Sequence, residues 1–235
     1  MYFCRTEDPL MEPEFRIRLN KKLYLKDPEQ SELGKKILKQ GMDLIIKLGF
    51  EQFTFKKLAT NIGTTEASVY RYFENKHRLL TYLINWYWTY LEYKILFHTK
   101  NIADPEVKLK KVIELLSEEP KLEGKSEELS EKSAYELLML EGSKAYLTRH
   151  VDSDNKDKFF KPYKDLCADF SAMIHEYNPN YPFPRSLAST LLEMSHSQKY
   201  FMNHLPSLTD FRHEKTNAKL KVFLEHLLFQ AIRKK

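Results

Sequence analysis

The sequence predicts an all-α protein, with three short helices near the N-terminus and a larger helical bundle after them. Only six of the 235 residues are glycines, and lysine, glutamate and leucine, which favour helices, are abundant. Apolar residues recur at the three- and four-residue spacing of amphipathic helices, and no segment alternates apolar and polar residues as a strand does. A hydrophobic content of 42% is enough to form a substantial core.

Residues 1–30 precede the first predicted helix and form an N-terminal extension. They hold six basic and six acidic side chains, so the segment has no net charge. Several basic residues cluster near the first helix: Arg16, Arg18, Lys21 and Lys22. The segment is therefore either an ordinary extension packed on the next domain or an extended basic arm.

The first two helices are indicated by their apolar faces and their ends. The first ends at Gly49-Phe50, and its apolar residues are Ile37, Leu38, Leu44, Ile45 and Leu48. The second begins at Thr54, whose hydroxyl can accept a hydrogen bond from an amide of the first turn. It ends at Gly63, because glycine takes the left-handed conformation at no steric cost.

The third helix begins at Thr65 and buries Val69 and Phe73, which lie four residues apart. Its outer face holds Thr65, Ser68, Arg71 and Tyr72. Hydroxyl and guanidinium groups form hydrogen bonds with phosphates and base edges, so this face is suited to DNA. Two short amphipathic helices joined at a glycine are typical of a helix-turn-helix DNA-binding unit, although a plain helical hairpin with a solvated polar face has the same pattern.

Residues 31–80 resemble the N-terminal domain of the tetracycline-repressor (TetR) family. The matching features are Gly49-Phe50, Thr54-x3-Leu58-Ala59, Gly63, Thr65, Val69-Tyr70-Arg71-Tyr72-Phe73, Lys76 and Leu79-Leu80. The resemblance implies a sequence-specific DNA-binding transcriptional regulator, most often a dimeric repressor. In such a protein the arm alternative for residues 1–30 implies a contact in the minor groove.

Ten residues are expected to contact DNA: Thr54, Lys56, Thr65, Glu66, Ala67, Ser68, Tyr70, Arg71, Tyr72 and Lys76. The resemblance implies that Thr54 and Lys76 bind phosphates, that residues 65–68 lie nearest the bases, and that residues 70–72 contact the backbone or the groove wall. Lys56 adds to a basic face. Residues 31–80 hold nine basic and five acidic side chains, a net charge of +4 out of +5 for the chain, and this excess favours a phosphate backbone as partner.

The sequence departs from the usual family pattern at several positions. Many relatives have Lys or Arg in place of Glu66 and Gly in place of Ala67, and Ile62 replaces a commoner Ala. Glu66 either accepts a hydrogen bond from a cytosine amine or points to solvent. His77-Arg78 replaces a commoner acidic pair and is expected to add positive charge near the DNA. These departures concern which bases are read.

Residues 81–235 are predicted to form an all-α bundle. We expect helices at about 76–97, 105–118, 127–147, 156–177, 185–204 and 208–232, a loop at 121–126 and a polar turn at 151–155. The resemblance implies that this domain binds an effector and forms a homodimer through its last two helices. Their apolar residues form either that interface or the internal core: Leu187, Leu191, Met194, Phe201, Leu220, Phe223, Leu224, Leu227, Leu228 and Ile232.

Aromatic residues form a stripe on the helix at 76–97, at Trp86, Tyr90, Tyr93 and Phe97. Aromatic and methionine side chains with a few hydroxyls can line a pocket for an apolar or aromatic small molecule. The candidate lining residues are Trp86, Tyr90, Tyr93, Tyr135, Met139, Tyr163, Cys167 and Phe170. The alternative for each of them is an ordinary place in the bundle core.

Other classes of function are not indicated. No catalytic triad order, paired-carboxylate motif, P-loop or glycine-rich nucleotide motif is present, so neither an enzyme nor a cofactor is expected. Glu193, His196 and His204 share a helix face at a spacing that chance explains, so no metal is expected either. Cys4 and Cys167 lie far apart, and no signal-peptide-like or membrane-spanning run is present, which favours the cytoplasm.

The sequence thus predicts a homodimeric repressor that reads a palindromic operator in double-stranded DNA and is relieved by a small apolar or aromatic ligand. The alternative is a protein of the same fold that acts mainly through protein–protein contacts.

Overall fold

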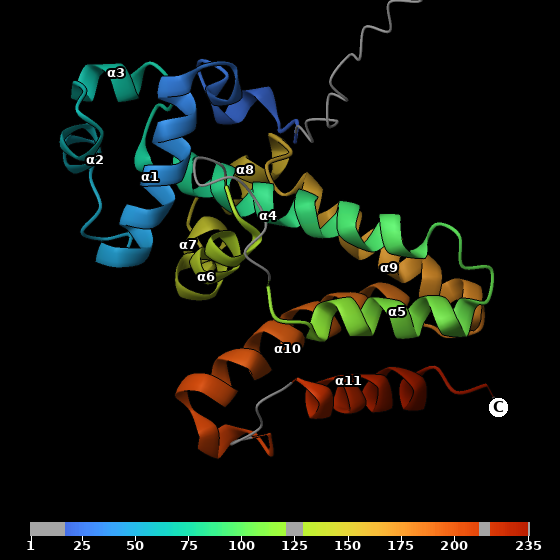
Figure 1. Ribbon diagram of the computed structural model, residues 1–235. Helices are drawn as coiled ribbons and strands as arrows, with labels where there is room; N and C mark the ends of the chain where they lie inside the picture. The colour runs from blue at the N-terminus through green and yellow to red at the C-terminus, as the bar shows by residue number, and fades with distance from the viewer. Residues whose placement is uncertain (1–16, 121–128, 212–216, 235) are drawn as a thin grey trace, which may run out of the picture.

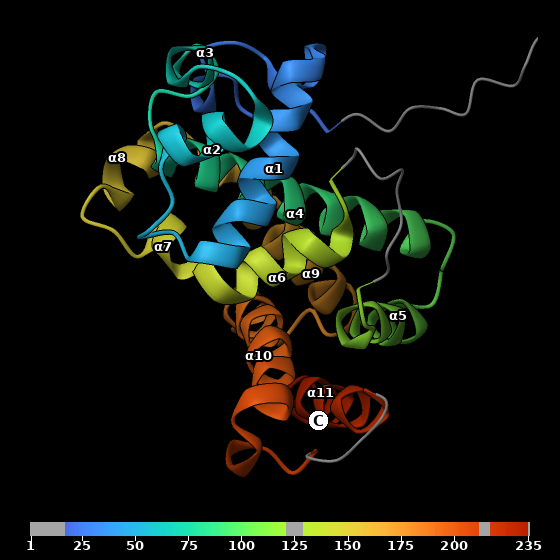
Figure 2. The same ribbon diagram turned by 60° about the vertical axis from the view of Figure 1, so that its left-hand side comes forward.

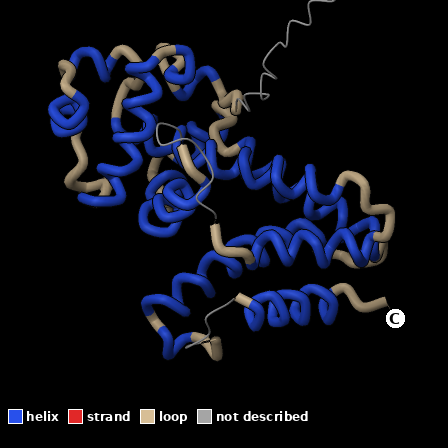
Figure 3. The backbone as a smooth tube through the Cα atoms, in the orientation of Figure 1, coloured by secondary structure: helices blue, strands red, loops and turns tan. Residues whose placement is uncertain are grey.

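The computed structural model describes residues 17–120, 129–211 and 217–234, and all regular structure in these residues is helical (Figure 1, Figure 3). The predicted all-α fold class is confirmed. Helices α1 to α3 form a small domain at one end, and α4 leads from this domain into the larger bundle (Figure 1). None of the described helices has both the length and the apolar character needed to cross a bilayer.

The first domain consists of α1 (Glu32–Leu48), α2 (Phe55–Ile62) and α3 (Glu66–Tyr70). Each helix begins after a side chain that accepts a hydrogen bond from an amide of the first turn, at Ser31, Thr54 and Thr65. Helix α2 ends at Gly63, which has φ of 70° and ψ of 40°. The caps predicted at Thr54 and Thr65 and the left-handed Gly63 are confirmed.

Residues 17–30, which include two short 3-10 helices (Lys21–Leu23 and Pro28–Gln30), pack on this domain. Leu23 is buried, and the amide of Leu25 donates to the carbonyl of Tyr72 at 2.8 Å. Gly34 of α1 lies so close to Pro28 that a Cβ atom there would stand 2.2 Å from the Pro28 carbonyl oxygen. For these residues the packed alternative is confirmed and the extended arm is wrong.

The larger bundle begins with α4 (Lys76–Thr99), so the predicted domain boundary after residue 80 falls inside one continuous helix. The later helices are α5 (Pro105–Ser117), α6 (Glu131–Glu141), α7 (Ser143–Tyr146), α8 (Val151–Lys156), α9 (Lys161–Tyr177), α10 (Pro184–His204) and α11 (Ala218–Ala231). Helix α9 packs against both α4 and α10, and α11 packs against α5 and α10. The buried apolar residues of the first domain and of the bundle form one cluster.

Two predicted boundaries around residue 155 are wrong. The expected polar turn at 151–155 is helix α8, and the helix expected from residue 156 begins only at Lys161. Between them Lys158 has φ of 61°, a conformation that a continuous right-handed helix does not contain. The two helices are therefore separated by a local change of backbone conformation that apolar spacing does not reveal.

Two further helices also start later than predicted. The helix expected at 127–147 begins after the cap residue Ser130 and is divided into α6 and α7 by a turn at Gly142. The helix expected from residue 208 begins at Ala218, after a 3-10 helix at Pro206–Leu208. The loop expected at 121–126, together with Cys4 and Arg16, lies outside the described residues.

Candidate nucleic-acid interface

Helices α2 and α3 lie together at the end of the molecule opposite α11, as both ribbon views show (Figure 2). The ring of Phe55 in α2 meets the ring of Tyr70 in α3 edge to face, with centroids 5.0 Å apart. Val69 and Phe73 are completely buried and attach α3 to the core of the domain. The remaining side of α3 faces solvent.

The outward side of α2 and α3 combines hydroxyls, a phenol and positive charge. We call it the α2–α3 surface, and its residues are Thr54, Lys56, Thr65, Glu66, Ala67, Ser68, Tyr70 and Arg71, of which Glu66 and Ser68 are half-buried and the others exposed. The hydroxyls of Thr65 and Ser68 bond to each other at 2.9 Å, and Thr65 Oγ1 also accepts from the Ser68 amide at 3.2 Å. Eight of the ten residues expected to contact DNA are thus at least partly exposed on α2, α3 and the ends of these helices.

Tyr72 does not lie on this surface, which corrects the expected outward position. Its side chain is only 3% exposed, and its hydroxyl is hydrogen-bonded to Ser31 Oγ at 2.8 Å. This hydrogen bond lowers the pKa of the Tyr72 phenol, and the nearby ammonium of Lys26, 5.1 Å from the ring centroid, acts in the same direction. Tyr72 therefore joins the end of the α3 segment to the start of α1.

Lys76 binds backbone carbonyls of the protein itself in this structure, whereas a DNA phosphate was expected as its partner. Its ammonium donates to the carbonyl oxygens of Phe50, Glu51 and Phe53 at 2.8, 3.1 and 3.2 Å. It also lies 4.6 Å from the centroid of the Phe50 ring. An ammonium has three protons to donate, so the connection between α1 and α2 uses the whole hydrogen-bonding capacity of Lys76.

His77 and Arg78 face the second domain, which corrects the expectation that they add positive charge near DNA. Arg78 Nη1 lies 3.2 Å from Asp154 Oδ1, and His77 Nε2 lies 3.3 Å from Asp154 Oδ2. The guanidinium also stands over the ring of Phe159 at 4.3 Å. The Asp154 side chain is only 5% exposed, so these contacts form a buried polar connection between the start of α4 and α8.

The aromatic stripe of α4 is present but faces partly outward. The rings stack in pairs, Trp86 on Tyr90 at 5.6 Å and Tyr93 on Phe97 at 6.0 Å. Trp86 and Tyr90 are half-buried, whereas Tyr93 is 47% and Phe97 65% exposed. The stripe as a whole therefore does not line the interior of the bundle.

The buried aromatic residues of α4 are Tyr82, Tyr87 and Trp88, and none of them belongs to the predicted stripe. The centroid of Trp88 lies 4.5 Å from that of Tyr163, and the centroid of Tyr87 lies 6.0 Å from that of Tyr135. Both α4 rings also contact the imidazole of His196. Of the predicted pocket residues, Tyr135 thus packs against Tyr87 and Tyr163 against Trp88.

The other predicted pocket residues have ordinary positions in the bundle. Phe170 is completely buried, and Met139 and Cys167 are half-buried. Burial raises the pKa of the Cys167 thiol to about 11, so this thiol stays protonated at neutral pH. Glu193 accepts a hydrogen bond from the Tyr163 hydroxyl at 2.7 Å.

Sequence reasoning missed a buried polar cluster between α4, α6 and α10. Lys94 pairs with Glu131 at 2.9 Å, and the Lys199 ammonium donates to the Glu118 carbonyl at 2.6 Å. Burial lowers the pKa of His196 to about 3 and that of Lys199 to about 8. The sequence did contain one sign of this cluster, the spacing of its residues. His196 and Lys199 follow Leu192 by four and seven residues, which places them on the same face of the helix as this apolar residue.

Comparison with known proteins supports the relation that the N-terminal motifs suggested. Residues 37–83 match the model of the bacterial regulatory proteins of the tetR family. No curated protein sequence matches the chain. The matched segment contains α2, α3 and the start of α4, and so includes all residues of the α2–α3 surface.

Solved structures share the fold over most of the chain. AibR in complex with isovaleryl coenzyme A and operator DNA is 17% identical, with a TM-score of 0.59 over 83% of this chain and 98% of that one. The fatty acid degradation regulator FadR from Bacillus halodurans is 16% identical, with a TM-score of 0.58 over 85% and 96%. The superantigen PfiT is also 16% identical, with a TM-score of 0.59 over 89% and 100%.

At these identities the structural likeness establishes the fold and leaves function to the residues of the site. The family model matches the segment that carries the helix-turn-helix, and the neighbours share the two-domain helical architecture around it. Residues 37–83 therefore match the tetR family of bacterial regulatory proteins, and the chain as a whole shares the fold of these solved structures.

Proposed function

We propose that the protein is a homodimeric transcriptional repressor that reads a palindromic operator with the α2–α3 surface. The observation that carries the proposal is the composition of this surface, in which Lys56 and Arg71 are exposed and the hydroxyls of Thr65 and Ser68 are paired with each other. Cations bind phosphates, and hydroxyls and guanidinium groups bond to base edges. The excess of positive charge in residues 31–80 supports the same partner.

The proposed dimer forms through α10 and α11. Leu220, Leu224, Leu228 and Ile232 are completely buried within the chain, so these four belong to the internal core and not to an interface. Other apolar residues of the two helices remain at least partly accessible to a second copy: Leu187, Met194, Phe201, Val222, Phe223 and Leu227. A two-fold axis between the last helices gives two reading surfaces, as a palindromic site requires.

The proposed repressor is released by a small molecule bound in the second domain. AibR, whose fold this chain shares, was solved with both a ligand and operator DNA. A ligand releases DNA if it binds better to a spacing of the two reading domains that does not fit the operator. Helix α4 is the natural connection, since it begins beside α3 and continues through the bundle (Figure 1).

The test is selection of bound duplexes from a random DNA library by the purified full-length protein at moderate salt. We expect recovery of a palindrome, followed by salt-dependent binding to it. Arg71→Ala should weaken that binding about tenfold and lower the salt slope by about 1, as expected for the loss of a phosphate or base contact. Arg149→Ala, at an exposed arginine of the second domain, is the matched control and should change neither.

Weak binding without sequence preference, or an Arg71→Ala variant with unchanged affinity, contradicts the proposal. The outcome then favours the protein–protein alternative, in which the same fold acts without an operator. Size measurement of each variant shows whether the oligomeric state is intact, so that a lost dimer is not mistaken for a lost DNA contact.

A further inference from the structure

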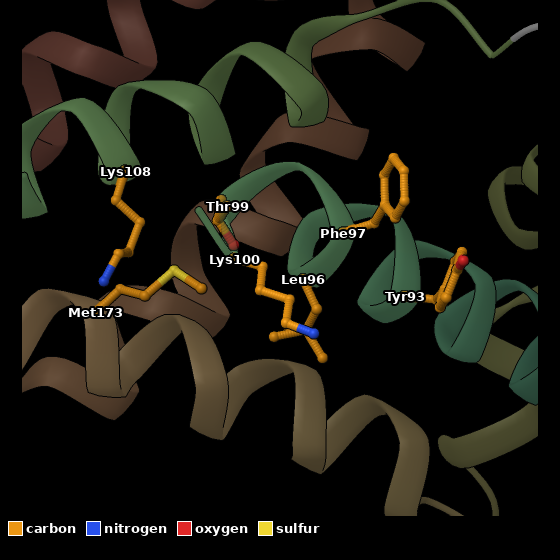
Figure 4. Close-up of a pocket in the computed structure, with 7 residues that line it drawn as sticks. All are labelled: Tyr93, Leu96, Phe97, Thr99, Lys100, Lys108 and Met173. Carbon is orange, nitrogen blue, oxygen red and sulfur yellow. The ribbon is translucent and has the colours of Figure 1, made fainter. Parts of the chain in front are cut away.

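A cavity of about 610 Å³ opens between α4, α5 and α9, at the end of α4 that is remote from the α2–α3 surface (Figure 4). Its volume falls in the range of about 300–1,000 Å³ that is usual for small-molecule sites. The residues that line it are Tyr93, Leu96, Phe97, Thr99, Lys100, Lys108 and Met173. Of the pocket residues predicted from the sequence, Tyr93 alone belongs to this set.

The walls of the cavity are mainly apolar. Leu96 is 41% exposed, and Met173 is almost fully buried. The stacked rings of Tyr93 and Phe97 add aromatic surface. The hydroxyl of Thr99 donates to the carbonyl of Ile95 at 2.7 Å, so its proton is used inside the helix. Such walls are suited to an alkyl chain, because burying apolar surface is favourable at about 25 cal/mol per Å².

The charged groups of the lining are two ammoniums. Lys108 is paired with Glu176 at 2.6 Å and its side chain is 17% exposed. Lys100 is exposed and, among the described residues, has no carboxylate partner. Figure 4 shows the side chains of Lys100 and Leu96 next to one another, with Lys108 and Met173 on the opposite side. The lining therefore places positive charge next to apolar side chains, and none of the lining residues is acidic.

We propose that this cavity binds an amphiphile that joins an apolar chain to one anionic headgroup, in the class of medium-chain carboxylates. The chain lies on Leu96 and Met173, and the headgroup pairs with the Lys100 ammonium, which is solvated when the cavity is empty of ligand. A cationic amphiphile is repelled by Lys100, and a neutral one gains only the apolar contacts. The inference names the ligand class of the effector, and in this sense it rests on the proposed function.

Isothermal titration of the full-length protein with sodium decanoate tests the inference, with decan-1-ol and decyltrimethylammonium as matched probes. We expect saturable binding of decanoate that weakens as salt rises, and no binding of the cation. Lys100→Gln should lower the affinity for decanoate about three- to fivefold, the effect of one partly exposed ion pair, and leave decan-1-ol unchanged. Leu96→Asn should weaken both of these ligands about tenfold through lost apolar contact.

Two substitutions at exposed residues of α6 and the segment after α7 serve as controls, Lys132→Gln and Leu147→Asn; neither should alter binding. Failure of decanoate to bind, equal binding of the cationic probe, or a Lys100→Gln variant with unchanged decanoate affinity overturns the inference. Operator binding is measured on the same preparations without ligand. A protein that selects an operator but does not bind decanoate refutes only the ligand class, whereas decanoate binding without operator selection refutes only the proposed function.

Discussion

Replacing Lys76 by methionine is expected to destabilise the protein without removing a DNA contact. The Lys76 ammonium donates to the carbonyls of Phe50, Glu51 and Phe53, and these bonds use all three of its protons. The three carbonyls lie in the connection that sets the position of α2 against α1. Methionine keeps most of the length and the apolar stem but has no proton to donate.

The expected loss follows from these three bonds. A hydrogen bond to a charged group contributes about 1.5–3 kcal/mol when it is buried. Lys76 is half-buried, so water replaces part of what is lost, and we expect about 2–3 kcal/mol in total. In a protein of this size that lowers the Tm by about 4–12 °C. Lys47→Met, at an exposed lysine of α1, is the control and should cost less than about 0.5 kcal/mol.

Thermal unfolding measures the stability, and salt titration of operator binding at a temperature where both proteins are folded measures the contact. Loss of a phosphate contact lowers the salt slope by about 1, whereas loss of an internal anchor leaves the slope unchanged. A Lys76→Met protein that is as stable as the parent but has a smaller slope would refute the reasoning and restore Lys76 to the DNA interface.

Three further predictions concern stability. Asp154→Asn should cost about 1–3 kcal/mol in chemical denaturation, since it removes the carboxylate that pairs with Arg78; an unchanged midpoint contradicts this. Gly34→Ala should lower the Tm by the equivalent of about 1–3 kcal/mol, because its Cβ meets the Pro28 carbonyl; a more stable variant excludes that clash. Burial raises the pKa of Glu92 from 4.5 to about 7, so between these pH values the folded protein keeps a proton that the unfolded chain releases, and stability falls as pH rises. Glu92→Gln should gain stability relative to the parent across that window, and a pH-independent difference argues against it.

The parts of the site that were predicted correctly are those that local chemistry determines. Thr54 and Thr65 cap their helices through amides three residues away, and Gly63 adopts a conformation that its own lack of a side chain permits. These features need no knowledge of the rest of the fold. The all-α class likewise follows from spacing within each segment.

The error at Tyr72 has a definite physical cause. We assigned faces to residues 65–73 by helical spacing, but α3 ends at Tyr70 and the following residues form turns. Beyond the last helical residue the 3.6-residue period no longer fixes the direction of a side chain. Tyr72 therefore turns inward to Ser31, a partner 41 residues away in the sequence. The partners of Lys76 and Arg78 were missed because they lie 23 to 76 residues away in the sequence.

Carboxylates from three parts of the second domain bind the N-terminal part of the chain and the start of α4. Glu141 of α6 accepts from the amide of Phe50 at 3.0 Å, Asp154 of α8 pairs with Arg78, and Asp157, just after α8, pairs with Lys22 at 2.6 Å. Polar contacts of this kind can be exchanged for water at a smaller cost than an apolar core can be opened. The orientation of the first domain is thus held by α4, by the apolar cluster that the two domains share and by these exchangeable polar contacts. A ligand that binds beside α4 shifts the first domain from one orientation to another only if it binds the second orientation more tightly. Weakening one of these polar contacts reduces the difference in affinity that the shift requires.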